Sequence, residues 1–323
     1  MNKESIDLGL ENIWRSWFVF KKGKNFTTEL HAFQYHMEKN LYELFKTLND
    51  NSYRHGGYRK FIVCDNKPRE ISVARVRGRV VHRLVYDYLN KIYDKTFIYD
   101  AWSCRMNKGL LGAIERTQTF LQRYPHAYIW KGDVKKFFDS VDQETLLNML
   151  ALRIKDSETF ILLQEIIGSY TTVTGRKVGM PIGNLTSQIF ANIYLNELDR
   201  FVKYELKPNA YLRYGEDFIL VENNLEKLNF FRLETIKFLE TRLKLRMNSK
   251  SDKIVKAKNG LRFLGVKFCP ICRTLNRRNL SRTASKLSPG NISSYSDLLK
   301  KHGSGKQIKN FNWLVYEKLL ADF

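Results

Sequence analysis

Apolar residues recur at helical spacing along most of the chain. The pattern predicts helices over residues 26–50, 80–92, 110–123, 143–152, 158–167, 184–206 and 225–243. Short apolar runs bounded by turn residues predict strands at 58–64, 71–76, 245–248 and 261–268, and a further strand through Asp133 that ends at 138–140. The basic, serine-rich tail from about residue 277 is expected to be helical over much of 296–320.

Two neighbouring carboxylates lie at a tight turn between two apolar runs, in the tetrapeptide Tyr214-Gly215-Glu216-Asp217. Adjacent acids repel each other, so a fold gains nothing from them unless a cation lies between them. Mg²⁺ is a hard ion that carboxylates and substrate phosphates bind together. A third acid, Asp133, follows an apolar strand upstream. Two strands that bring three carboxylates together predict two-metal chemistry at phosphorus.

Composition supports a folded protein with a polyanionic partner. The 323 residues are 43% hydrophobic and 13% aromatic, which excludes wholesale disorder and predicts two or three subdomains. A net charge of +22 at pH 7 favours nucleic acid as the partner, and exposed aromatic rings favour it further because bases stack on them.

The chain gives no sign of a membrane or secreted protein. No run approaches the ~20 apolar residues of a membrane span, and the first residues lack the apolar core of a signal peptide. We therefore expect a cytoplasmic protein without a membrane partner. Cys269-Pro270-Ile271-Cys272 has zinc-knuckle spacing without a second ligand pair nearby, so a hairpin turn with two free thiols is the better interpretation.

Five motifs in order resemble those of a reverse transcriptase. They are a basic hairpin at 58–76, the strand before Asp133, a glycine-punctuated connection at 175–183, the carboxylate turn at 214–217, and Phe263-Leu264-Gly265. The tetrapeptide alone would be weak evidence, but the five together are specific, and they span roughly residues 53–268. The resemblance implies an α+β right-hand polymerase. Its expected parts are an N-terminal helical segment (1–50), fingers with the start of the palm (51–132), the palm (133–270) and a small helical thumb (271–323).

The connection into the helix at 184–206 narrows the resemblance. Many reverse transcriptases have Gln-Gly and Ser-Pro where this chain has Ile182-Gly183 and Ser187-Gln188. With these residues the chain resembles the reverse transcriptases of diversity-generating retroelements. Those enzymes copy a template RNA and misread adenines. Related bacterial enzymes of antiphage defence share much of this palm.

The resemblance assigns the catalytic and metal-binding roles. Asp133, Glu216 and Asp217 are expected to hold two Mg²⁺ ions, with Mn²⁺ as an alternative, and Val134 to add its carbonyl oxygen. The family pair is Asp-Asp, so Glu216 adds one methylene. Three outcomes stay open: the backbone compensates, the enzyme is slow or prefers Mn²⁺, or the protein is mainly an RNA-binding subunit.

The resemblance also assigns residues to substrate and nucleic acid. Phe138 matches the gate that clashes with a 2′-hydroxyl, and Ile182 replaces a glutamine that touches nucleotide and template. The nucleotide-binding set is Lys67, Arg69, Lys135, Lys136, Phe138, Ile182, Gly183 and Lys250, where Lys253 competes with Lys250 for its role. The nucleic-acid-binding set is Arg75, Arg77, Arg105, Lys108, Ser187, Gln188 and Gly265. Arg75, Arg77 and Arg79 are expected to share one face of an extended segment.

These observations predict an RNA-directed DNA polymerase that copies a template or non-coding RNA into cDNA from dNTPs. The expected setting is a diversity-generating retroelement, with a small basic accessory protein or a second polymerase subunit as further candidate partners. The alternatives are an antiphage-defence reverse transcriptase, or a weakly catalytic palm-fold subunit that binds RNA within a larger complex.

Overall fold

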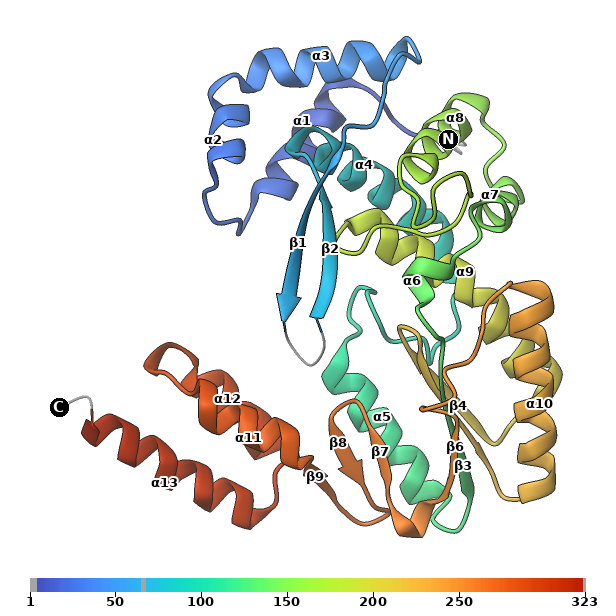
Figure 1. Cartoon of the computed structure of the whole chain (residues 1–323), viewed down its shortest axis with the longest axis vertical. Coiled ribbons are helices and arrows are strands. Elements are labelled where there is room, and N and C mark those ends of the chain that lie inside the picture. The colour runs from blue at the N-terminus through green and yellow to red at the C-terminus, as the bar shows by residue number, and fades with distance from the viewer. Residues whose placement is uncertain (1–4, 65–67, 322–323) are drawn as a thin grey trace.

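The computed structural model describes residues 5–64 and 68–321 (Figure 1). The N-terminal part consists of helices α1 (Leu10–Lys21), α2 (Thr28–Tyr35), α3 (Met37–Asn49) and α4 (Val76–Tyr93), followed by a 3₁₀ turn, η1 (Asp94–Thr96). Helix α4 packs against α1 on one side and against α9 (Leu185–Arg200) on another. The single helix predicted over 26–50 is two helices, α2 and α3, because His36 between them leaves the helical conformation.

A two-stranded antiparallel hairpin, β1 (Tyr58–Cys64) and β2 (Pro68–Ala74), projects from the N-terminal helices (Figure 1). The chain segment before α9 lies along β2: the Ser72 amide donates to the carbonyl of Ile182 at 2.9 Å. The buried Asn184 side chain continues the pairing, since it donates to the Ser72 carbonyl and accepts from the Ala74 amide. Gly183 is required here, because its φ is +110° and a Cβ would lie 2.7 Å from Ile71.

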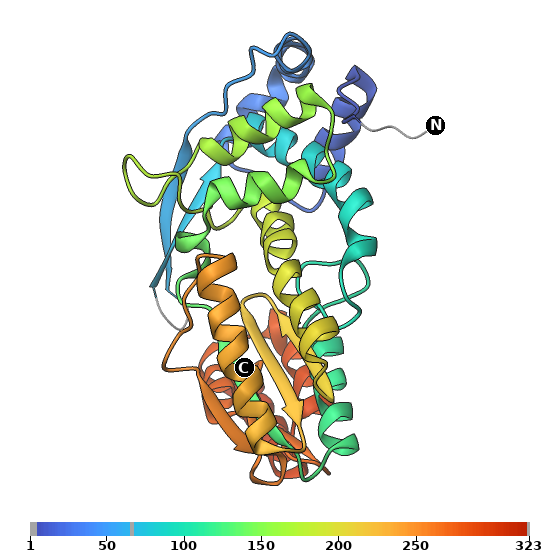
Figure 2. The same cartoon turned by 90° about the vertical axis from the view of Figure 1, so that its right-hand side faces the viewer.

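The central sheet is antiparallel and has the order β4 (Ala210–Tyr214), β5 (Asp217–Glu222), β3 (Tyr128–Asp133) and β6 (Lys253–Lys256). Helices cover both of its faces, with α10 (Leu225–Arg242) on β3 and β5 and α5 (Leu110–Arg123) against β4 (Figures 1 and 2). Alternate residues therefore enter two separate cores: Trp130 packs in one, and its chain neighbour Ile129 packs in the other. Covering both faces explains why residues 218–221 of β5 are continuously apolar.

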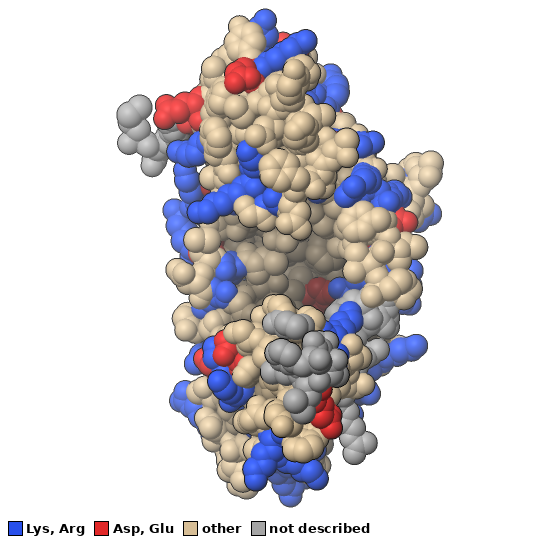
Figure 3. All heavy atoms as spheres, turned by 90° about the vertical axis from the view of Figure 1, so that its left-hand side faces the viewer, with Lys and Arg blue, Asp and Glu red and all other residues tan. Residues whose placement is uncertain are grey.

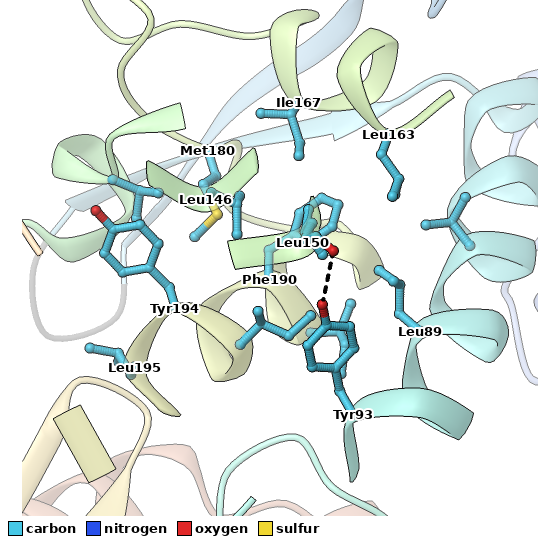
Figure 4. Packing of buried hydrophobic residues seen from close by; sticks show 14 of the residues in the cluster. Leu89, Tyr93, Leu146, Leu150, Leu163, Ile167, Met180, Phe190, Tyr194 and Leu195 are labelled. Carbon is cyan, nitrogen blue, oxygen red and sulfur yellow. Dashed lines mark hydrogen bonds between the residues drawn. The ribbon is translucent and has the colours of Figure 1, made fainter. Parts of the chain in front are cut away.

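The larger core lies above the sheet and joins the sheet to the N-terminal helices. It is built by α4, α9, α7 (Gln143–Ala151) and α8 (Ser157–Gly168), whose leucines, isoleucines and aromatic rings interdigitate (Figure 4). The Tyr93 hydroxyl lies within this apolar packing and reaches the carbonyl of Leu150 at 3.5 Å (Figure 4). Helix α9 continues into a π-helical segment, η2 (Phe201–Leu206), where Lys207 ends it in a left-handed conformation.

The C-terminal part combines a small sheet and three helices. The sheet consists of β7 (Leu261–Phe263), β8 (Val266–Phe268) and β9 (Arg273–Leu275), preceded by the 3₁₀ turn η3 (Ala257–Asn259). Positive φ angles at Leu264 and Gly265 form the two-residue turn between β7 and β8. The helices are α11 (Arg277–Lys286), α12 (Ile292–His302) and α13 (Gly305–Ala321), with the 3₁₀ turn η4 (Pro289–Asn291) between the first two.

Four local predictions are wrong. Residues 137–140 form a short helix, α6 (Phe137–Ser140), because Lys136 turns left-handed and ends the extended chain. Residues 245–248 make only an isolated bridge through Met247, and the edge strand of the sheet is β6 instead. Helix α1 was not predicted from its spacing. Arg75, Arg77 and Arg79 do not share a face of an extended segment, because α4 begins at Val76.

None of the helices within residues 5–64 and 68–321 is long and apolar enough to cross a membrane.

Replacing Gly132 by alanine is expected to destabilise the fold by about 1–3 kcal/mol, the usual range for overpacking a filled core. A Cβ at Gly132 would lie 2.4 Å from the Phe218 ring and 2.9 Å from the Met247 methyl group. Gly57→Ala is the matched control, because nothing lies within 4 Å of its Cβ position. Equal urea midpoints for both variants would contradict the packing argument.

Candidate active site

The antiparallel pairing of β3 and β5 brings the predicted carboxylates together. Asp133 is the last residue of β3 and lies directly opposite Asp217, the first residue of β5. Cross-strand partners of this kind have Cβ atoms about 4.5–5.5 Å apart and point to the same face. Glu216 precedes Asp217 in the turn, and its carbonyl accepts a hydrogen bond from the Val134 amide at 3.3 Å.

Burial and neighbouring charges change the protonation of Asp217. The pKa of Asp217 is raised to about 6, chiefly by burial and to a smaller extent by the charges of Asp133 and Glu216, against the lowering effect of Lys131. The Lys131 ammonium lies 3.8 Å from a carboxylate oxygen of Asp217. Lys131 is two residues before Asp133 on the same strand and therefore projects to the same face. The Lys131 ammonium therefore offsets part of the negative charge of the neighbouring carboxylates.

Asp133 is held by the segment that follows α10. The Asn248 side-chain amide donates to Oδ2 of Asp133 at 2.7 Å, and the Asn248 main-chain amide donates to the Asp133 carbonyl at 2.8 Å. The Ser251 hydroxyl lies 3.5 Å from the same carboxylate oxygen. These contacts fix the Asp133 carboxylate and leave Oδ1 directed away from Asn248.

A buried ion pair fixes the turn that carries Glu216. Arg213 and Asp199 have 1% and 0% of their side chains exposed, and they make two hydrogen bonds of 2.8 and 2.7 Å. The Arg213 guanidinium also donates to the Gly215 carbonyl at 3.0 Å and to Asn192 at 3.3 Å. The Tyr211 hydroxyl donates to Asp199 at 2.8 Å. The backbone of the catalytic turn is thus tied to α9.

The chemistry of this donor set fits a hard divalent ion, because three carboxylates meet with only one ammonium group against them. Their side chains are not yet arranged as a ligand shell: within the described ranges, no three His, Cys, Asp or Glu side chains surround a common metal position. Lys131 contacts the Asp217 carboxylate, and Asn248 contacts the Asp133 carboxylate. Asp133, Glu216 and Asp217 are the residues that would hold the ions.

One face of the molecule is hollowed, and acidic atoms lie inside the hollow (Figure 3). The face seen in Figure 3 is hollowed between the N-terminal half and the C-terminal helices, with acidic atoms deep inside and lysine and arginine atoms around it. The exposed Arg69 on β2 is close enough that its charge lowers the pKa of Asp217, against the stronger effect of burial. The fingers hairpin therefore presents a guanidinium toward the carboxylates. Lys67, also predicted to bind nucleotide, lies outside the described residues.

Residues predicted to bind the nucleotide lie on two chain segments that contact each other. Phe138 is half-buried in α6, and its carbonyl accepts from the Met180 amide at 2.8 Å, which ties the two segments together. Ile182 and Gly183 follow in the connection that pairs with β2. Lys135 and Lys136 are exposed next to Phe138, and Lys250 is exposed in the turn after Asn248.

Several residues predicted to bind nucleic acid contact the protein instead. The Arg105 guanidinium bonds to Asp94 and to the carbonyls of Asp94, Ile98 and Ala101, so it fixes its own loop. The Lys108 ammonium lies 3.5 Å from the Tyr99 ring centre and donates to the Tyr99 carbonyl.

Ser187 and Arg77 are also engaged within the fold. Ser187 is buried and donates to the Pro181 carbonyl at 2.7 Å, which ties the first turn of α9 to the loop before it. Arg77 donates to Thr47 and stacks over Tyr53. Template contact by these two side chains stays a prediction. Arg75 and Gln188 are exposed, and a Cβ on Gly265 would lie 2.5 Å from Asn279 of α11.

The residues that position the carboxylates were missed by the sequence analysis. Two signals were present: Arg213 is a charged residue inside an apolar strand, and Asp199 lies within the apolar stretch of α9. A buried charge needs a partner of opposite charge, so the two residues could have been predicted to form an ion pair. Asn248 gave no comparable signal, because an asparagine in a polar turn is ordinary.

The comparison with protein families agrees with this geometry. The family model for reverse transcriptase (RNA-dependent DNA polymerase) matches residues 55–268. Because the match covers more than half of the chain, the chain belongs to this family.

The curated relatives are intron-encoded and bacterial proteins. The chain is 29% identical over 182 residues to the putative COX1/OXI3 intron 2 protein of Saccharomyces cerevisiae, covering 53% of this chain and 21% of that protein. It is 25% identical over 240 residues to protein YkfC of Escherichia coli K12, covering 62% and 63%. It is 26% identical over 173 residues to the group II intron-encoded protein LtrA of Lactococcus lactis, covering 51% and 28%. The chain thus spans only part of each relative.

Solved structures share the fold at low identity. Telomerase from Candida tropicalis aligns with a TM-score of 0.54 and 14% identity, over 80% of this chain and 56% of that one. Telomerase from Candida albicans, in complex with a fragment of telomeric RNA, gives 0.53 and 14%, over 85% and 58%. With the family match, these alignments confirm the predicted α+β right-hand polymerase fold.

Removing one partner of the buried pair, as in Arg213→Met, is expected to cost about 3–5 kcal/mol because Asp199 stays buried and unpaired. The double variant Asp199→Leu/Arg213→Met should recover much of this loss, since no buried charge remains. It should still polymerise slowly, because the Gly215 carbonyl has lost its donor. Denaturation midpoints and primer extension separate the two effects, and full activity in the double variant would contradict the positioning role.

The metal-free protein should lose stability as pH rises from about 4 to 6. The pKa of Asp217 is raised in the folded state, so the folded state binds more protons than the unfolded state in this window. Asp217→Asn should remove that dependence and stabilise the metal-free protein at pH 7 by about 1 kcal/mol, a value discounted for partial exposure. Urea unfolding in chelator across this pH range measures it, and an unchanged pH slope in the variant would refute the assignment.

Proposed function

We propose that this protein is an RNA-directed DNA polymerase that extends a primer on an RNA template with dNTPs. The observation that supports this most is the pairing of Asp133 with Asp217, with Glu216 beside them in the adjoining turn. Membership of the reverse transcriptase family supports the reaction class. A basic surface around the hollow suits two nucleic-acid strands.

The carboxylates would hold two Mg²⁺ ions. When bound, a pair of divalent ions supplies charge stabilisation on the oxygens of an in-line phosphoryl displacement. Asp133 enters this arrangement already oriented by Asn248, and Glu216 and Asp217 sit on a turn whose backbone is fixed by Arg213. Lys131 offsets the repulsion among the acids before ions bind.

The fingers would bind the triphosphate. The exposed Arg69 guanidinium offers a planar fork that matches phosphate oxygens, and its field already reaches Asp217. Phe138 would lie against the sugar and exclude a 2′-hydroxyl, which favours deoxynucleotides. Ile182 cannot hydrogen-bond a base or sugar, so the site has little penalty for a mismatched pair at this contact.

The setting that fits the residues best is a diversity-generating retroelement. Ile182-Gly183 and Ser187-Gln188 support this choice, since both depart from the pattern common to reverse transcriptases. The intron-encoded relatives support a retroelement origin in general. In this proposal a cognate RNA is the template, and a small basic accessory protein is the candidate partner.

Primer extension on an RNA template with dNTPs tests the polymerase activity. We expect extension in Mg²⁺ by the natural chain and a loss on the order of a thousandfold in Asp133→Ala, because electrostatic stabilisation of the transition state is removed. Glu216→Asp should change the ratio of Mg²⁺- to Mn²⁺-dependent rates by up to about a hundredfold, since about 1 Å of carboxylate displacement has that effect. Product sequencing of Ile182→Gln should show fewer errors.

RNA affinity of the Asp133→Ala variant is the control, because loss of catalysis should leave binding of the template intact. Extension that appears only after Glu216→Asp would overturn the proposal for the natural chain and favour an RNA-binding subunit. Extension at the natural rate in Asp133→Ala would place the chemistry elsewhere.

A further inference from the structure

The hairpin between β8 and β9 ends in two cysteines that face each other. The Cys269 amide donates to the Cys272 carbonyl at 2.7 Å, and the Cys272 amide donates to the Cys269 carbonyl at 3.3 Å. This exchange continues the strand register from Phe268 opposite Arg273. Directly opposite residues of a hairpin project to the same face, so both sulfur atoms lie on one side of the tip.

A side chain of helix α5 holds the turn between the two cysteines. The buried Gln118 side chain on α5 donates to the carbonyls of Cys269 and Pro270 at 2.9 and 3.1 Å. Cys272 is exposed and Cys269 is half-buried. Ile271, between them, has 93% of its surface exposed, the largest value among the exposed large hydrophobic side chains of the described residues. The pair is therefore preformed, rigid and accessible.

The geometry favours a metal ion over a disulfide. A pair that exchanges both main-chain hydrogen bonds has the wider separation of an antiparallel ladder, with Cα atoms about 5.5 Å apart. Its Cβ atoms stay near the upper end of the 4.5–5.5 Å cross-strand range, whereas a disulfide needs about 3.8 Å. A tetrahedral ion with Zn–S bonds of about 2.3 Å separates two sulfurs by close to 4 Å and closes this gap without moving the backbone.

We propose that Cys269 and Cys272 bind a zinc ion together with the same two cysteines of a second copy of this chain. A structural zinc takes four ligands, and the described ranges hold no third His, Cys, Asp or Glu side chain placed to join the pair. A two-fold axis through the ion supplies an identical pair and brings the two exposed Ile271 side chains together. Four thiols lose four protons to solvent, and the resulting complex carries a charge of −2.

Two features of the surroundings suit this occupant. The exposed Lys267 lies two residues before Cys269, on the strand that leads to the cysteine pair. Two copies bring two such lysines to the anionic complex. The tip also lies at the end of the palm sheet away from the carboxylates: Cys269 Sγ is 3.5 Å from the Cβ position of Gly260, whose turn is bonded to Ala127 before β3 begins. The catalytic hollow stays open in such a dimer.

Zinc titration of the reduced, chelator-treated protein tests the proposal. We expect half an equivalent of zinc per chain to survive desalting, together with a doubled molar mass by light scattering that excess chelator reverses. Cys269→Ser and Cys272→Ser should each abolish both effects, and Cys104→Ser, another exposed cysteine, should keep them. Cobalt in place of zinc should give the absorption of a tetrathiolate site.

Retention of no zinc overturns the proposal, and so does one equivalent per chain at the mass of a single chain. Zinc retention unchanged in Cys272→Ser also overturns it. Thermal unfolding of the serine variants checks that they fold, which the exposed position of Cys272 favours. Primer extension by these variants is expected to be unchanged, so failure of the zinc site and failure of the polymerase proposal are separable.

Discussion

The structure depends on holding three like charges at one edge of a sheet. The register of β3 and β5 sets Asp133 against Asp217, and no shift is tolerated, because a one-residue slip would send every side chain of β3 to the wrong core. Strand pairing and core packing thus supply the free energy that opposes carboxylate repulsion. Burial raises the pKa of Asp217, and the charges of Asp133 and Glu216 add to that rise. The negative charge gathered at this edge favours the binding of cations.

Around that edge, each positioning contact comes from a different part of the chain. Arg213 ties the turn at Gly215 to α9, Asn248 ties Asp133 to the segment after α10, and Asn184 ties the segment before α9 to β2. The Arg213 contact is fully buried, where an unpaired charge would cost several kcal/mol. The end of β2 that pairs with this segment is buried, whereas β1 and the first residues of β2 are mostly exposed.

Periodicity and turn chemistry predicted most elements and the carboxylate pairing, because an acid that ends one apolar strand and a pair that begins another have few places to meet. The errors arose where local conformation overrode pattern. Lys136 breaks a strand by a left-handed φ, and residues 245–248 run beside β3 without forming a ladder. Arg105 and Lys108 donate to carbonyl groups of their own loop, and these contacts could not be predicted because a basic residue in a loop has the same sequence pattern whether it contacts a phosphate or a carbonyl. Only the fold tells the two apart.

The effect of having Glu216 in place of aspartate depends on how rigidly the turn backbone is held. The Gly215 carbonyl is bonded to a guanidinium that is itself fixed by Asp199, so the turn cannot withdraw to make room for a longer acid. The extra methylene must then be accommodated by the side chain, which has one more rotatable bond than aspartate. Mg²⁺ has a strict octahedral preference, so Glu216 would meet it through its own rotamers and not through a shift of the turn. The Arg213–Asp199 ion pair therefore determines how the longer acid is accommodated.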